Sequence, residues 1–110
     1  MIRIIFSNKE KQKVIKKLKS KVLQIDKQAT VILYGSRARG DYNEDSDWDF
    51  LILTELPESK EIKEAFTNKI FEAELELEEP ISTIIHNKSL WENYEVTPLY
   101  HNIQKEGLLV

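Results

Sequence analysis

The 110-residue sequence is constrained most by a near-continuous apolar run at residues 48–54, Trp-Asp-Phe-Leu-Ile-Leu-Thr. A strand with one face in water alternates apolar and polar side chains, whereas an almost unbroken run is typical of a strand covered on both faces. A second short run, residues 29–34, is rich in β-branched residues and ends at Gly35, where the backbone has special freedom. The sequence therefore predicts two buried core strands.

Two amphipathic helices are predicted to accompany these strands. In residues 7–27, the apolar side chains of Val14, Leu18 and Val22 recur at helical spacing, and lysines fill the remaining arc. Residues 59–77 show a similar apolar stripe, begin at a serine suited to a helix N-cap and end before a proline. Three shorter segments complete the prediction: a third strand at 81–86, a final helix at 97–105, and residues 2–6 as either a strand or a docked arm.

Length and composition indicate one soluble domain spanning residues 1–110. The chain has the size of one ordinary domain, and 41% hydrophobic residues are enough to bury one modest core. It contains no cysteine, which excludes disulfides and thiolate chemistry and is expected of a cytoplasmic protein. The apolar run at the N-terminus is too short for a signal peptide or a membrane span, so no membrane association is expected.

The charge balance argues against a dedicated binder of duplex DNA. Sixteen basic and 19 acidic side chains give a net charge of -3, without the strong positive field that holds phosphates. One basic stretch has two interpretations, either a solvated helix face or a surface for a polyanion or an acidic protein. Its lysines are Lys9, Lys11, Lys13, Lys16, Lys17, Lys19 and Lys21.

The segment between the two core strands carries the residues best suited to chemistry. It begins with Gly35-Ser36 at the end of one strand and closes with Asp47-Trp48-Asp49 at the start of the next. At Gly35 the missing side chain lets a phosphate approach the backbone, and a helical turn beginning at Ser36 would direct N–H groups outward as an anion cradle. Strand side chains alternate between faces, so Asp47 and Asp49 are expected on the same side, opposite Trp48.

Two neighbouring carboxylates repel each other unless a cation lies between them. Hard oxygen ligands beside a phosphate cradle suit Mg2+ or Mn2+, which can bridge Asp47, Asp49 and a triphosphate. Arg37 and Arg39 lie on the cradle turn, and one of them is a candidate phosphate clamp because guanidinium matches phosphate oxygens in a fork. The alternative for either arginine is a salt bridge to the acidic loop that follows.

Two other interpretations apply to this segment. The alternating acids from Asp41 onward resemble the opening of an EF-hand calcium loop, but the sixth position is Ser46 instead of glycine and the twelfth is Ile52 instead of an acid. A polar hairpin loop with scattered acids is the simpler alternative for an isolated Asp-x-Asp. It does not explain why Gly-Ser ends one strand where Asp-x-Asp begins the next.

These residues resemble the nucleotidyltransferase superfamily that includes polymerase beta, and within it the minimal, stand-alone nucleotidyltransferases. The family pattern is Gly-Ser, ten residues, then Asp-x-Asp, and here Gly35-Ser36, residues 37–46 and Asp47-Trp48-Asp49 fit it without a gap. The local sequence Gly-Ser-Arg-Ala-Arg-Gly is also similar to that of this subgroup. The order of predicted elements resembles the family core over nearly the whole chain.

The resemblance implies an α/β (α+β) nucleotidyltransferase fold, a small mixed sheet of three to four strands flanked by helices. It implies magnesium-dependent transfer of a nucleoside monophosphate, with ATP or another nucleoside triphosphate as substrate and Asp47 and Asp49 as metal ligands. Family members of this size are similar in acting as antitoxins that adenylylate a HEPN-domain toxin. A hydroxyl acceptor on such a partner, and assembly into a homo- or hetero-oligomer, are therefore expectations from the resemblance.

One departure from the family pattern leaves the activity open. The superfamily usually places a third carboxylate on the strand after the second helix, yet residues 81–86 contain no acid. Glu78, Glu79 or a water held by Ser82 are candidate replacements, although both glutamates also fit a solvated helix end. The alternative to an enzyme is a non-catalytic antitoxin or a nucleotide-binding module that occludes its partner. We assign no site to His86 or to the aromatic residues near it.

Overall fold

In the computed structural model, which describes residues 3–4 and 9–110 with side chains from residue 11 onward, five strands form one mixed sheet. Its strand order is β1-β5-β2-β3-β4; β1 and β5 are parallel, β3 and β4 are parallel, and β2 is antiparallel to both of its neighbours. The strands are β1 (Arg3–Ile4), β2 (Thr30–Tyr34), β3 (Trp48–Thr54), β4 (Ile81–Asn87) and β5 (Leu108–Leu109). The helices are α1 (Lys9–Leu23), α2 (Ser36–Arg39), α3 (Lys60–Leu77), α4 (Lys88–Trp91), the 3-10 turn η1 (Glu92–Tyr94) and α5 (Pro98–Glu106).

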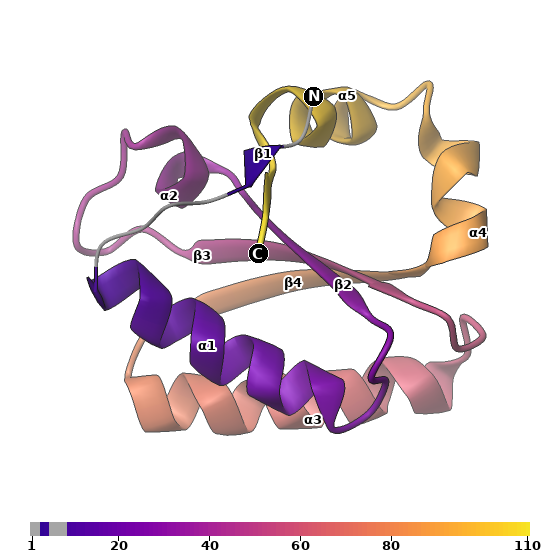
Figure 1. Ribbon diagram of the computed structural model, residues 1–110, viewed down its shortest axis with the longest axis horizontal. Coiled ribbons are helices and arrows are strands. Elements are labelled where there is room, and N and C mark those ends of the chain that lie inside the picture. The colour runs from indigo at the N-terminus through magenta and orange to yellow at the C-terminus, as the bar shows by residue number, and fades with distance from the viewer. Residues whose placement is uncertain (1–2, 5–8) are drawn as a thin grey trace.

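Helices cover both faces of the sheet (Figure 1). Helices α1 and α3 lie side by side on one face, whereas α4 and α5 belong to the other. On that second face Trp91 of α4 and Ile103 of α5 pack with Ile32 and Leu51 of the two central strands. The mixed sheet between helices confirms the predicted fold class, and the cover on both sides explains the unbroken apolar run in β3.

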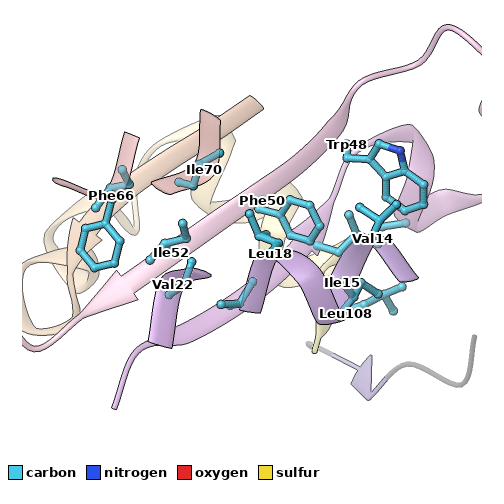
Figure 2. Packing of buried hydrophobic residues seen from close by; sticks show 14 residues of the cluster. Val14, Ile15, Leu18, Val22, Trp48, Phe50, Ile52, Phe66, Ile70 and Leu108 are labelled. Carbon is cyan, nitrogen blue, oxygen red and sulfur yellow. The ribbon is translucent and has the colours of Figure 1, made fainter. Parts of the chain in front are cut away.

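Alternation along β3 divides its side chains between the two faces. Trp48, Phe50 and Ile52 are buried against the α1 and α3 side, where Figure 2 shows Phe50 beside Leu18 of α1. Leu51 belongs to the opposite cluster, with α4 and α5. Each large apolar side chain that is fully buried stabilises the fold by about 1.5–3 kcal/mol. The same alternation decides on which face each carboxylate of the Asp-x-Asp pair lies.

The predicted elements are largely confirmed, with two corrections, and α4 and η1 are added in residues 88–94, where the sequence predicted only a connecting segment. Strand β3 has the predicted bounds, and α3 begins after Ser59, whose Oγ accepts the Ile62 N–H at 3.2 Å. Helix α1 ends at Leu23 and not at residue 27, because the Asp26 carboxylate takes the Gln28 N–H at 2.9 Å and closes a turn there. The predicted start of that helix at residue 7 lies outside the described residues.

The second correction concerns the C-terminal end of the chain. Residues 108–109, which were given no element, form β5 between β1 and β2. A two-residue strand is too short to show a period of two, so only its tertiary partners define it. Of the open alternatives for residues 2–6, the described part, Arg3–Ile4, is a strand. Within the described chain, no helix has the length and apolar character needed to cross a membrane.

Part of the basic face of α1 is used inside the fold. Lys17 Nζ lies 2.8 Å from a carboxylate oxygen of Glu76, and Lys21 Nζ lies 3.1 Å from Glu72, both on α3. These contacts join two helices that lie side by side. They favour the solvated-face interpretation for this part of the lysine stretch over a surface for polyanions.

A buried carboxylate fastens the far end of β3 to the turn after α1. Asp26 accepts the Thr54 hydroxyl at 2.6 Å and the N–H groups of Glu55 and Gln28, both at 2.9 Å. Burial raises the pKa of Asp26, but these donors outweigh burial, so the pKa lies below its usual value. The ionised carboxylate therefore contributes stability above the unfolded-state pKa of about 3.9.

We expect Asp26→Asn to lower the free energy of unfolding by about 1–2 kcal/mol near neutral pH, because an amide accepts these hydrogen bonds more weakly. The difference from the natural protein should shrink as the pH falls below about 4, where the natural carboxylate becomes protonated. Urea unfolding followed by tryptophan fluorescence measures both effects. Asp45→Asn, on an exposed loop position, is the control; an equal loss there would contradict the role of Asp26.

Candidate active site

Asp49 lies on the sheet face that α4 and α5 cover, at the end of the sheet where β2 stops and β3 begins. Its neighbours across the sheet are Tyr34 of β2 and Ser82 of β4, each paired with it in register. Side chains paired in register share a face, so the three lie in one row. Asp47 precedes β3 by one residue and is exposed. Its charge acts on Asp49, as expected for two acids on the same side.

Gly35 is fixed beside Asp49 by two independent constraints. Its backbone has φ +74°, a conformation that side chains disfavour. A Cβ built there would overlap a carboxylate oxygen of Asp49 and lie 3.2 Å from the carboxyl carbon. The missing side chain therefore makes room for Asp49 in this structure, and the backbone of the Gly-Ser turn directly adjoins the acidic pair.

The short helix α2 begins at Ser36, as the anion-cradle interpretation requires. The Ala38 and Arg39 N–H groups both donate to the Gly35 carbonyl at 3.0 Å, and Gly40 closes the turn at φ +96° by donating to the Ser36 carbonyl. The first N–H groups of a helix have no acceptor within it. Here these belong to Ser36 and Arg37, so their N–H groups are suited to an anion.

Arg37 lies on the opposite side of the sheet from Asp49, where it holds the loop. Its guanidinium carbon is 4.5 Å from the Trp48 ring centroid and 4.4 Å from that of Tyr42. The guanidinium donates to the Ser46 carbonyl at 3.3 Å and to the Glu44 carbonyl at 3.4 Å. The side chain is only 3% exposed. Of the two roles considered for Arg37, this placement favours a contact with the acidic loop over a phosphate clamp.

Arg39 lies on the Asp49 side and pairs with a residue that the sequence did not identify. Its Nη1 is 3.0 Å from Glu106 Oε2, and its Nε is 3.2 Å from Asp41 Oδ2. The other oxygen of Glu106 accepts the Gly35 N–H at 3.1 Å. Glu106 ends α5, far along the chain from Gly35, and no local pattern separates it from the other glutamates. The pair with Asp41 is the salt bridge to the acidic loop given as the alternative for this arginine, and contact with phosphate stays a prediction for its exposed side chain.

The electrostatics of the site favour a cation. Burial raises the pKa of Asp49, the Asp47 charge raises it further and Glu106 adds to the shift, while Arg39 opposes it. Burial, Asp49 and Glu106 also raise the pKa of Tyr34 to about 12. Burial is the largest cause of both shifts, and negative charge on this face adds to it. A divalent cation between the carboxylates would relieve this repulsion.

The three candidate replacements for a third carboxylate lie at different positions in the structure. Glu79 accepts the Trp48 indole N–H at 3.3 Å and lies 4.0 Å from Arg37, so it belongs to the opposite face. Glu78 is the exposed residue that ends α3, at φ 55°. Ser82 is in register with Asp49. Among the residues that the structure describes, no three His, Asp or Glu side chains are grouped to hold a metal ion.

His86 and the aromatic residues near it, to which the sequence assigned no functional role, lie at the end of β4 that is far from Asp49. His86 pairs in register with Leu53 near the end of β3, and its Nδ1 lies 2.7 Å from Glu58 Oε1. Its ring is 4.5 Å from that of Tyr94, and Trp91 beside it is buried. These contacts fit a packing and hydrogen-bonding role.

The sequence matches one characterised family over most of its length. The nucleotidyltransferase domain profile aligns with residues 12–110. A curated protein of Methanocaldococcus jannaschii, named as a candidate protein adenylyltransferase, is 42% identical over 80 residues. That alignment covers 70% of this chain and 80% of the relative.

One solved structure has a similar fold, and a second is similar at a lower score. A crystal structure described as a toxin-antitoxin with AMP-PNP is similar at a TM-score of 0.58, covering 93% of this chain and 72% of that one at 18% identity. A second, a candidate nucleotidyltransferase from Sulfolobus solfataricus, has a TM-score of 0.45 at 20% identity, with 94% and 87% of the chains covered. At 18% identity, the first likeness concerns the fold alone.

We expect Gly35→Ala to be far more destabilising than Gly40→Ala. Both glycines have positive φ, which costs about 1–3 kcal/mol for a side chain. Only at Gly35 would the new Cβ also collide with Asp49, whereas nothing lies within 4 Å at Gly40. Chemical unfolding of both variants measures the difference. Adding Asp49→Ala to Gly35→Ala should recover part of the loss; equal losses at the two glycines would refute the close approach.

We expect Arg37→Lys to lower the free energy of unfolding by about 2 kcal/mol, because a compact ammonium cannot reach two carbonyls while stacking on two rings. Arg39→Lys is the matched control, since that side chain is 46% exposed and its pairs contribute little. Fluorescence of Trp48, on which Arg37 stacks, reports the change. A larger loss from the Arg39 variant would be inconsistent with Arg37 holding the loop.

Proposed function

The chain belongs to the nucleotidyltransferase domain family, a family of transferase enzymes, and from that membership we propose that it transfers AMP from ATP to a hydroxyl on a partner protein. The observation that carries the proposal is the contact between the Gly-Ser turn and the Asp-x-Asp pair, with Gly35 directly against Asp49. The relative named as a protein adenylyltransferase supports AMP and a protein acceptor. Another nucleoside triphosphate remains compatible with these residues.

In this proposal Asp47 and Asp49 hold Mg2+ or Mn2+. The donor set fits such an ion, because both side chains supply hard oxygens, and because burial and then the Asp47 charge raise the pKa of Asp49. When bound, the cation neutralises charge on the triphosphate and on the departing pyrophosphate. Since the described residues include no group of three metal-binding side chains, phosphate oxygens and water would complete the coordination.

The remaining residues bind and orient the triphosphate. N–H groups at Ser36 and Arg37, with the Ser36 hydroxyl, would donate to phosphate oxygens, and Arg39 would contribute a guanidinium. The acceptor hydroxyl oxygen attacks the α-phosphorus, the bond to pyrophosphate breaks, and the hydroxyl proton is released to solvent. The protein's contribution is alignment of this in-line displacement.

The partner completes the proposal. One structural relative is a toxin-antitoxin, and this chain, as one domain over residues 1–110, would act as the antitoxin that modifies a HEPN-type toxin in the cytoplasm. A second function, occlusion of the toxin without catalysis, is favoured by one observation. Ser82, and not an acid, lies in register with Asp49 on β4.

Calorimetric titration with ATP, with and without Mg2+, tests the site. We expect Mg2+-dependent binding that weakens at least about tenfold in Asp47→Asn/Asp49→Asn, because the amides cannot hold the cation. Asp45→Asn, an exposed acid of the same loop, is the control. Absence of binding by the natural chain in both conditions would refute the enzyme.

Transfer of an α-phosphate label from ATP to a co-expressed HEPN-domain protein then separates the two functions. Catalysis predicts that the double variant loses labelling. Occlusion predicts that neither the natural chain nor the double variant labels the partner, and that both capture it equally.

A further inference from the structure

Glu106 occupies the donors that a triphosphate would use. One of its carboxylate oxygens accepts the Gly35 N–H at 3.1 Å, and the other lies 3.0 Å from Nη1 of Arg39. Its side chain is 18% exposed, so the carboxylate is partly shielded from water. A single carboxylate thus bridges the backbone of the Gly-Ser turn and the guanidinium on the Asp49 side of the sheet.

The fold fixes this position. Glu106 is the last residue of α5, and the following Gly107 is buried and donates its N–H to the Ile103 carbonyl at 2.7 Å. Leu108 then pairs with Leu33 of β2, one strand away from Asp49. Because the buried Gly107 and the strand pairing of Leu108 follow directly, the backbone holds Glu106 beside the Gly-Ser turn.

The charge of Glu106 opposes a second anion in the same place. After burial and the nearer charges, it adds to the raised pKa values of Asp49 and Tyr34, so its charge acts on this side of the sheet. Carboxylate and phosphate oxygens accept the same N–H donors, and guanidinium pairs with either. A triphosphate on the cradle therefore competes with Glu106 for Gly35 and Arg39.

We propose that Glu106 sets the affinity of the site for triphosphate by acting as an internal competitor, whose carboxylate must leave the Gly35 N–H and Arg39 before phosphate oxygens bind there. The inference rests on the proposed function and deepens it by adding a residue of the triphosphate site. Arg39, whose Nε also pairs with Asp41, would then exchange Glu106 for the phosphate chain at its Nη1.

The test compares Glu106→Gln with the natural chain by calorimetry, using Mg2+ with ATP and, separately, Mg2+ with inorganic tripolyphosphate. The amide keeps an acceptor for the Gly35 N–H but loses the charge that holds Arg39. We expect binding of both ligands to tighten about two- to fivefold, the upper part of the range for loss of one partly exposed ion pair. Glu95→Gln, which removes an equal charge on an exposed turn, should leave affinity unchanged.

A double-variant cycle assigns the gain to Arg39. In Arg39→Gln, the further change Glu106→Gln should tighten binding by less than twofold, because the guanidinium that it would release is absent. A full gain in that background would overturn the role given to Arg39. Thermal unfolding of each variant, measured alongside, ensures that only folded protein is compared.

The outcomes distinguish this inference from the proposed function. Binding by the natural chain that weakens in Glu106→Gln would overturn the inference and indicate that Glu106 helps hold the cation or the phosphate. Unchanged affinity would overturn it too, while leaving the proposed function intact. Failure of the natural chain and the variant alike to bind either ligand would refute the proposed function.

Discussion

The close approach of Gly35 to the Asp49 carboxylate is the contact on which the rest of the site depends. It follows from the antiparallel register of β2 and β3, in which Tyr34 pairs with Asp49 and the next residue turns over the carboxylate. A one-residue slip of this register would send Asp49 to the other face and bring Trp48 into its place. The burial of both strands between helix layers excludes such a slip, so core packing positions the acidic pair.

The sheet also separates two tasks that the sequence places side by side. Arg37 and Arg39 are two residues apart on α2, yet Arg37 stacks on Trp48 at one face while Arg39 pairs with Glu106 at the other. The first arginine ties the loop between the strands to the folded core through carbonyl acceptors. The second remains exposed beside the carboxylates. Arg37 thus stabilises the loop on one face of the sheet, and Arg39 is accessible to an anion on the other.

The placement of the two arginines on different faces shows the limit of what the sequence could predict. Alternating burial in β3, the helical turn at Ser36 and the shared face of the acids follow from local periodicity and spacing, and so the core strands were predictable. The sides taken by the two arginines were not, because a four-residue helix has no apolar stripe to orient it. Glu106 reaches the site only through β5, whose two residues carry no periodic signal.

The balance of charge around the Gly-Ser turn limits how any nucleotide can bind there. The charges of Asp47 and Glu106 both raise the pKa of the half-buried Asp49, and the charge of Arg39 opposes them. A triphosphate adds several negative charges, so a bare anion would meet net repulsion at short range. A divalent cation between the acids reverses the sign of the local field, and it does so where Gly35 exposes its backbone. Electrostatics alone therefore couple metal and triphosphate, whichever acceptor follows.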